Sequence, residues 1–259
     1  MAKNYQYIYG PVYSWRLGRS LGVDPLSAED KNCNYDCVYC QLGKTVHFAD
    51  ERRVFVETGD IIKEIESFPE GGIDYITFSG RGEPTLAKNL GEMIRIIKET
   101  RDEKVAVITN SSLLHEADVR RDLSRADFVL AKLDACDQDS FATVNRARGD
   151  LNFEKIVQGI REFRRGFKGK LALQLMFVAF NQSLGEAMAA IAGDIDADEV
   201  EINTPLRPCA VKPLSEEELG AIKEYFKDLP VKTVFEQERK IIAPMDEDNT
   251  VKRHGIYKN

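Results

Sequence analysis

Short and long apolar segments alternate along the chain. The short ones are rich in β-branched and aromatic residues, whereas in the long ones apolar residues recur every three or four positions. The short segments predict strands at Ser20–Val23, Ile73–Ser79, Lys104–Thr109, Phe128–Leu133, Leu171–Phe177 and Glu199–Asn203. The long segments predict helices at Gly59–Phe68, Leu86–Ile97, Leu113–Leu123, Phe153–Phe163, Leu184–Ala192 and Ser215–Phe226. This alternation predicts an α/β fold with parallel strands and right-handed crossovers, but periodicity does not distinguish a closed barrel from an open one.

The two ends of the chain have less regular patterns. Residues 10–26 contain two prolines and several glycines, which predicts an irregular lead-in around the first short strand. Residues 228–259 are polar and predict only a short strand at Val231–Phe235 and a basic tail at Lys252–His254. We therefore expect a core domain over residues 1–215, with a C-terminal helix and tail over residues 216–259 packed on it.

Composition and charge narrow the class of protein. With 259 residues, 43% hydrophobic and 31% charged, the chain has the make-up of a soluble globular protein. No apolar run approaches the roughly 18 residues of a membrane-spanning helix, and Met1–Gly10 lacks the apolar stretch of a secretory signal. The net charge of −7 disfavours nucleic-acid and anionic-membrane partners. Five cysteines, three of them clustered, argue against a disulfide framework and for a reducing cytoplasm.

The clustered cysteines are Cys33, Cys37 and Cys40, with the spacing C-x3-C-x2-C. Thiolates this close repel one another unless a metal neutralises them. A structural zinc site needs four ligands, usually as two separated pairs, and neither a second pair nor a histidine stands at such a spacing. Three thiolates on a cubane iron–sulfur cluster leave one iron open to a small molecule, which makes a catalytic site. The alternative is three cysteines without metal.

Because Tyr39 stands directly before the last cysteine, the motif resembles the C-x3-C-x-aromatic-C signature of the radical S-adenosylmethionine (SAM) superfamily. The resemblance covers roughly residues 10–215, and one branch, iron–sulfur oxidoreductases related to wyosine-forming tRNA enzymes, has a similar lead-in. It implies an open (β/α)6 partial barrel with SAM across its top. It also implies a [4Fe–4S] cluster on the three cysteines, whose open iron binds the methionine end of SAM. Reductive cleavage of SAM then gives a 5′-deoxyadenosyl radical.

A second motif follows the predicted strand at Ile73–Ser79. Its glycines let the backbone approach a ligand closely, and its proline suits the start of a helix. The alternative is an ordinary strand-to-helix turn. The G-G-E-P motif of the superfamily, which binds the amino group of SAM, occupies this place, although here Arg81 separates the two glycines. The resemblance therefore assigns SAM binding to Gly80, Gly82, Glu83, Pro84 and Thr85.

The expected SAM site also includes Tyr39 of the cysteine loop. Polar residues on or near the strand ends complete it: Asn110, Ser111, Lys132, Asp134, Gln174 and Asn203. For Asn110 and Ser111 the alternative is capping of the following helix. For Lys132 and Asp134, two apart on a strand, it is a salt bridge without a ligand role.

Four further residues allow two interpretations each. Cys136 and Cys209 both follow strands. Each thiol either transfers a hydrogen atom or holds substrate, or else it is a small buried apolar residue without a role in catalysis. Arg16 and Arg19 in the lead-in hold a carboxylate or a phosphate, or pair with acidic neighbours. The stretch Asn145–Arg148 resembles the N-R-P motif of the branch, with alanine in place of proline.

The sequence thus predicts an enzyme that cleaves SAM and abstracts hydrogen from an unidentified small-molecule, nucleobase or peptide substrate. An external reductant such as flavodoxin or ferredoxin supplies the electron. Two alternatives remain: an activating enzyme that generates a radical on a partner protein, and an iron–sulfur electron-transfer module without SAM chemistry.

Overall fold

The computed structural model describes residues 5–46, 48–49, 51–237, 240 and 242–255. In this part of the chain, eight strands form one sheet in chain order, with β1 and β8 at its two edges. The first pair is antiparallel and every later pair is parallel. The strands are β1 (Ile8–Ser14), β2 (Gly18–Val23), β3 (Tyr75–Phe78), β4 (Lys104–Thr109), β5 (Phe128–Lys132), β6 (Lys170–Met176), β7 (Glu199–Asn203) and β8 (Val231–Thr233).

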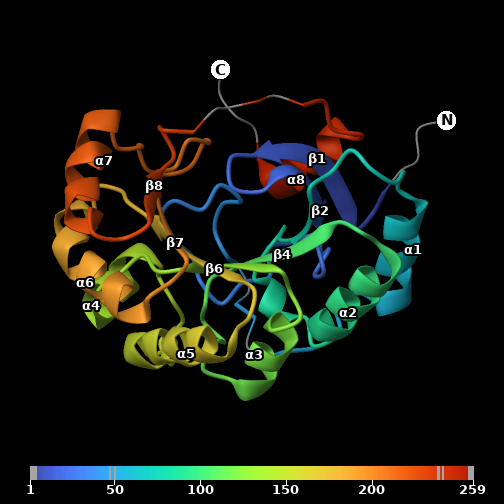
Figure 1. Ribbon diagram of the computed structural model, residues 1–259, viewed down its shortest axis with the longest axis horizontal. Coiled ribbons are helices and arrows are strands. Elements are labelled where there is room, and N and C mark those ends of the chain that lie inside the picture. Colours follow the sequence, from blue (N-terminus) through green and yellow to red (C-terminus); the bar gives the residue numbers. More distant parts are fainter. Residues whose placement is uncertain (1–4, 47, 50, 238–239, 241, 256–259) are drawn as a thin grey trace.

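Helices cover the outer side of the curved sheet, and the last helix lies beside β1 (Figure 1). None of the helices within the described ranges is long and apolar enough to cross a membrane. Their bounds are α1 (Thr58–Ser67), α2 (Leu90–Thr100), α3 (Ala117–Leu123), α4 (Gln138–Val144), α5 (Phe153–Gly166), α6 (Gly185–Ile195), α7 (Glu216–Lys223) and α8 (Glu247–His254). Short 3-10 turns occupy Pro84–Leu86, Gln182–Leu184 and Glu224–Phe226.

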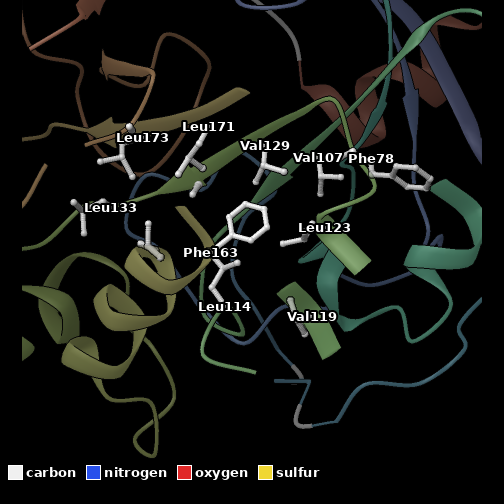
Figure 2. Packing of buried hydrophobic residues seen from close by; sticks show 14 of the residues in the cluster. Phe78, Val107, Leu114, Val119, Leu123, Val129, Leu133, Phe163, Leu171 and Leu173 are labelled. Carbon is white, nitrogen blue, oxygen red and sulfur yellow. The ribbon is translucent and has the colours of Figure 1, made fainter. Parts of the chain in front are cut away.

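The parallel strands are buried on both faces, as their nearly continuous apolar sequences require. Alternate side chains face the helices, where Figure 2 shows Val107, Val129, Leu171, Leu123 and Phe163. The intervening side chains face the inner side of the sheet. There Leu17, from the turn between β1 and β2, packs against Leu130 and Ala172. This turn therefore fills the inner side near the N-terminal ends of the strands.

The open parallel α/β fold is confirmed, and all six predicted parallel strands are present. The lead-in differs from the prediction, because Ile8–Ser14 forms an antiparallel strand against β2. Its one glycine and one proline lie where the register shifts, between Tyr9 and Val12, so they do not prevent pairing. The loop expected after Asp137 contains α4, which Asp137 and Ser140 begin with a reciprocal capping box.

Helix boundaries also shift. The helix expected from Leu113 begins at Ala117, after Glu116, which makes no side-chain capping bond. The basic tail is the last turn of α8, where positive side chains stabilise the carbonyl end of the helix. Beyond residue 215, β8 extends the parallel sheet next to β7, and α8 contacts β1.

Candidate active site

The loop that carries the three cysteines, residues 32–41, is fixed to the C-terminal ends of the strands by backbone hydrogen bonds. Asn32 pairs with Gly82, which follows β3: the amide of Asn32 donates to the carbonyl of Arg81 over 3.0 Å, and the amide of Glu83 donates to the carbonyl of Asn32 over 3.0 Å. Further along, the amide of Val38 donates to the carbonyl of Val144 at the end of α4 over 2.9 Å. The two ends of this loop are thus held by elements about 60 residues apart in the sequence.

The cysteine thiols lie in different environments. Cys33 is buried, whereas Cys37 and Cys40 are partly buried. Burial raises the pKa of Cys33 to about 12, with the nearby Cys37 adding to the effect. Burial raises the pKa of Cys37 to about 11, and Asp134 contributes in the same direction. Both thiols are therefore neutral at physiological pH unless a cation replaces their protons.

Two asparagine side chains direct N–H groups at these sulfurs. Asn110 Nδ2 lies 3.6 Å from Cys33 Sγ, and Asn145 Nδ2 lies 3.5 Å from Cys37 Sγ. The amide of Tyr35 adds a third donor to Cys33, at 3.5 Å. Donors of this kind are what cluster-bound sulfur accepts, because thiolate and sulfide carry negative charge.

The donor set fits an iron–sulfur cluster better than a single ion. Within the described residues, no three Cys, His, Asp or Glu side chains meet closely enough to hold one metal ion. A cubane binds each thiolate at a different iron, so its cysteines need not approach one another as closely as the ligands of one ion. Cys33, Cys37 and Cys40, with N–H donors on two of their sulfurs, are the residues that would hold it.

The two glycines of the second motif are surrounded by protein atoms. Gly80 and Gly82 have φ angles of +128° and +154°, which L side chains rarely adopt. A Cβ on Gly82 would lie 1.7 Å from the carbonyl oxygen of Asn32, and one on Gly80 would lie 2.6 Å from Cγ of Asp24. In this structure the glycines let the cysteine loop pair with the end of β3. Their contact with SAM stays a prediction.

Glu83 is 1% exposed and its carboxylate accepts four hydrogen bonds. The amide and hydroxyl of Thr85 donate to Oε1 over 3.0 and 2.6 Å, and the hydroxyl of Thr109 donates to it over 2.6 Å. The amide of Asn110 donates to Oε2 over 2.6 Å. Burial raises the pKa of Glu83 while these donors lower it. The carboxylate thus connects the end of β3 to the end of β4, next to Pro84, which starts a 3-10 turn.

The polar residues after β4 connect the sheet to the cysteine loop. Asn110 Nδ2 donates to Asn34 Oδ1 over 2.8 Å, and Asn34 Nδ2 donates to Ser112 Oγ over 2.7 Å. Ser111 has a φ of +69° and its hydroxyl donates to the carbonyl of Lys132 over 2.9 Å. Neither Asn110 nor Ser111 caps α3, so the capping alternative is wrong.

Asp134 is the centre of a second buried network. Its carboxylate accepts hydrogen bonds from the hydroxyl of Tyr39, from Asn145 Nδ2 over 3.0 Å and from the amide of Met176 over 2.8 Å. Lys132 Nζ lies 3.4 Å from Asp134 Oδ1 and 4.9 Å from the centre of the Tyr39 ring. The salt bridge is therefore present, and it lies against the aromatic residue of the cysteine loop.

The remaining predicted residues lie around this network. Gln174 is adjacent to Lys132 in the sheet register, and Asn203 accepts a hydrogen bond from the amide of Thr204 over 2.8 Å. Cys209 packs in the small apolar cluster that includes Val38 and Tyr39. Cys136 instead contacts Asp137 and Ser140 at the start of α4.

Sequence reasoning did not assign a role to Asn34 or Glu201, and it noted Asn145 only as part of a motif. Asn145 touches both Cys37 and Asp134, and Glu201 is a fully buried carboxylate on β7. The signal for Glu201 was its place in the middle of β7, where Val200 and Ile202 on either side mark a buried strand. Arg16 pairs with it: the Nε atom lies 2.7 Å from Glu201 Oε2, which confirms the acidic-neighbour interpretation for this arginine.

A hollow of about 770 Å³ lies at the N-terminal ends of the strands, around the starts of β3 and β4. Its lining residues include Asp74, Tyr75, Glu103 and Lys104. Residues 33–40 and the ends of the strands do not line it. The chemistry-bearing residues therefore lie at the other end of the barrel, where parallel α/β folds bind ligands.

Comparison with known proteins identifies the family. The family model of the radical SAM superfamily matches residues 31–190. A UPF0026 protein of Synechocystis is 41% identical over 84% of this chain and 81% of its own length. One of Methanocaldococcus jannaschii is 36% identical over 85% of this chain and 71% of its own. A probable GTP 3′,8-cyclase of Saccharolobus solfataricus is 24% identical over 78% of this chain and 64% of its own length.

Solved structures show the same fold at low identity. SuiB of Streptococcus suis bound to S-adenosylmethionine superposes with a TM-score of 0.61 and 14% identity, over 79% of this chain and 48% of that one. A radical SAM methyltransferase of Sphaerobacter thermophilus gives a TM-score of 0.60 and 13% identity, over 83% of this chain and 65% of that one. The chain thus spans about half to two thirds of these proteins. With the family model matching most of its length, the chain belongs to the radical SAM superfamily and is an enzyme whose cofactors are a [4Fe–4S] cluster and SAM.

Proposed function

We propose that this enzyme abstracts a hydrogen atom from a small polar substrate bound on the inner side of the sheet, beneath the loop of residues 32–41. The observation that carries the proposal is the position of the three thiols. They stand over the C-terminal ends of the strands, and amide donors from Asn110 and Asn145 reach the sulfurs of Cys33 and Cys37. An external flavodoxin or ferredoxin would deliver the electron, in a reducing cytoplasm.

Cys33, Cys37 and Cys40 would hold the cluster. The remaining predicted contacts to SAM divide by position. Gly80, Gly82, Pro84 and Thr85 follow β3, whereas Asn110 and Ser111 follow β4. Glu83 belongs to the group after β3. Lys132, Asp134, Gln174 and Asn203 lie on or just after β5 to β7, and Tyr39 of the cysteine loop contacts Lys132 and Asp134.

When bound, the cluster and SAM supply a 5′-deoxyadenosyl radical that removes hydrogen from a nearby carbon. The chain positions the reacting groups and excludes water. Tyr39, Asp134 and Asn145 fix the middle of the cysteine loop, because their side chains form one hydrogen-bonded network. Gly82 and Asn32 fix its beginning. Cys209, beside Tyr39, is the better placed of the two remaining thiols to meet a substrate radical.

The direct test is formation of 5′-deoxyadenosine. The protein is reconstituted with iron and sulfide without oxygen, reduced with dithionite and supplied with SAM. We expect the wild type to form the product and Cys37→Ala to form none, with loss of the cluster absorbance. Cys136→Ala is the matched control and should keep both, because Cys136 contacts Asp137 and Ser140 rather than the cysteine loop.

Two outcomes would contradict the proposal. A reconstituted cluster whose spectrum does not respond to SAM, with no product, would indicate an electron-transfer protein. Product formation that survives in Cys37→Ala would show that the chemistry does not depend on this loop.

A further inference from the structure

A row of polar side chains crosses the inner side of the sheet between the apolar floor and the cysteine loop. Lys132 of β5, Gln174 of β6 and Glu201 of β7 are successive register partners, so their side chains point the same way. One step toward the N-terminal ends, the corresponding positions of β5 and β6 are Leu130 and Ala172. Lys132 lies against the ring of Tyr39, which places the β5 end of the row beneath the cysteine loop.

Glu201 is the unusual member of this row. Its side chain is 0% exposed, yet neither carboxylate oxygen receives an aligned hydrogen bond from any described donor. Arg16 Nε is 2.7 Å from Oε2, so the pair is held by charge while the N–H bond is not directed at the oxygen. A buried acceptor without a donor destabilises a fold by about 1–3 kcal/mol, and more when it is charged. A buried acceptor of this kind is expected where a bound ligand supplies the missing hydrogen-bond donor.

Glu199, two residues earlier on β7, shows what a satisfied carboxylate looks like on the same strand. Its Oε2 accepts hydrogen bonds from Lys170 Nζ over 2.8 Å and from Lys232 Nζ over 2.7 Å. These donors lower the pKa of Glu199 although burial opposes them. The strand therefore does not leave carboxylates unsatisfied in general, and Glu201 is the exception.

Arg16 brings donors to the same place. The turn between β1 and β2 carries it inward, since its neighbour Leu17 packs on the apolar floor. The face of the guanidinium lies over the ring of Trp15, with Cζ 4.6 Å from the ring centre. Only 14% of the side chain is exposed. The edge of the guanidinium offers N–H donors next to the acceptor oxygens of Glu201.

We propose that the substrate binds at the Glu201 end of this row, beside the predicted SAM contacts Lys132 and Gln174, and that Glu201 and Arg16 together recognise an amide-like edge, a planar group in which an N–H donor lies beside a carbonyl or ring-nitrogen acceptor. The substrate N–H donates to Glu201, and Arg16 donates to the substrate acceptor. Gln174 lies next to Glu201 in the sheet register, and its side chain has both an acceptor and donors. Nucleobases and carboxamides share this edge. The inference rests on the proposed function for its location beneath the cysteine loop.

The first test changes the ligand and leaves the protein intact. Holoenzyme with cluster and SAM, without reductant, is titrated calorimetrically with two sets of probes. The nucleobase set is uridine and guanosine against 3-methyluridine and 1-methylguanosine, in which a methyl replaces the N–H. The carboxamide set is glutamine against its side-chain N,N-dimethylamide. We expect the unmethylated probe to bind about ten-fold or more tightly in one set, which also identifies the source of the edge.

Equal binding of methylated and unmethylated probes, or no binding in either set, would overturn the inference. Because no electron is supplied, this result is independent of SAM cleavage, so the proposed function can survive when the inference fails. Conversely, probe discrimination without 5′-deoxyadenosine formation would leave the binding row intact and overturn the proposed chemistry.

The second test changes the protein. Glu201→Gln replaces one acceptor oxygen by a donor and should weaken the discriminated probe about ten-fold or more. Glu199→Gln is the matched control on the same strand and should change binding less than about two-fold, because its partners are Lys170 and Lys232. Equal losses in the two variants would show that Glu201 acts through the fold rather than through contact with the ligand.

Discussion

Two buried glutamates of this enzyme differ in what surrounds them. Glu83, at the end of β3, is 1% exposed and accepts four hydrogen bonds from neighbouring residues. Glu201, in β7, is 0% exposed and receives no aligned hydrogen bond from the described residues. Burial raises the pKa of both, and for Glu201 it does so to about 7 although Arg16 opposes it. The protein itself supplies the hydrogen-bond donors of Glu83, whereas Glu201 is available to accept hydrogen bonds from a ligand.

The difference separates two tasks within one site. The Glu83 end is a rigid support that holds the cysteine loop, because every donor around it is already used. The row that contains Glu201 can bind a ligand, because both oxygens of Glu201 are still available to accept hydrogen bonds. An enzyme that uses a radical needs both. The radical source must be held in one geometry, while the substrate must exchange at each turnover.

Removing the satisfied carboxylate should have the largest effect. In Glu83→Ala, the hydroxyl of Thr109 and the amide of Asn110 lose their acceptor in a buried place. We expect the free energy of unfolding to fall by about 4 kcal/mol, measured by denaturant titration. A loss below about 1 kcal/mol would show that the network does not support the fold.

Neutralising the unsatisfied carboxylate should have the opposite sign. The pKa of Glu201 is about 7 in the folded protein against 4.5 for the free group. The folded state therefore holds this proton more tightly, so the stability that Glu201 contributes decreases as pH rises from 4.5 to 7. We expect Glu201→Gln to be more stable than the wild type by about 3 kcal/mol at pH 8 and nearly equal at pH 4.5.

The measurement for this variant is the difference in unfolding free energy between it and the wild type at the two pH values. Glu199→Gln serves as the control, and it should be less stable than the wild type at pH 8, since the lysines lower the pKa of Glu199. A Glu201→Gln variant with no gain at pH 8 would indicate that Arg16 compensates the buried charge fully.

A third substitution tests the support at its tightest point. In Gly82→Ala, the new Cβ would lie 1.7 Å from the carbonyl oxygen of Asn32, at a φ of +154°. We expect a loss of about 2 kcal/mol in unfolding free energy and poorer cluster incorporation, measured as iron per chain. Gly149→Ala, which would meet no atom within 4 Å, should leave both unchanged. Normal iron content in Gly82→Ala would show that the loop does not depend on this pairing.

The smallest expected effect is at Asn145. Its side-chain amide is shared among Cys37, Tyr39 and Asp134 at 3.5, 3.4 and 3.0 Å, so only the contact with Asp134 has the length of an ordinary hydrogen bond. Asn145→Ala should lower stability by about 1 kcal/mol and shift the midpoint potential of the cluster, because one donor to Cys37 is lost. An unchanged potential, measured by redox titration of the absorbance, would contradict a role at the sulfur.

Much of the fold was predictable because its pattern is local. The pattern of apolar residues predicts the strand Lys104–Thr109 and the helix Phe153–Gly166. The spacing of Cys33, Cys37 and Cys40 indicates the cluster. The β1 strand was missed, because its glycine and proline resemble a loop until β2 is available to pair with it. Helix α4 was missed because seven residues carry too few periods to recognise.

By itself the sequence determined the alternating elements, the three-cysteine loop and the superfamily, since each depends on neighbours along the chain. Only the tertiary structure decided which polar groups meet. The carboxylate of Glu83 accepts hydrogen bonds from Thr109 and Asn110 at the end of the next strand. Glu201 instead forms an ion pair with an arginine 185 residues away and accepts no aligned hydrogen bond in the described part of the chain. Satisfaction of a buried charge depends on packing between distant segments, so no local pattern distinguishes a structural glutamate from one that awaits a ligand.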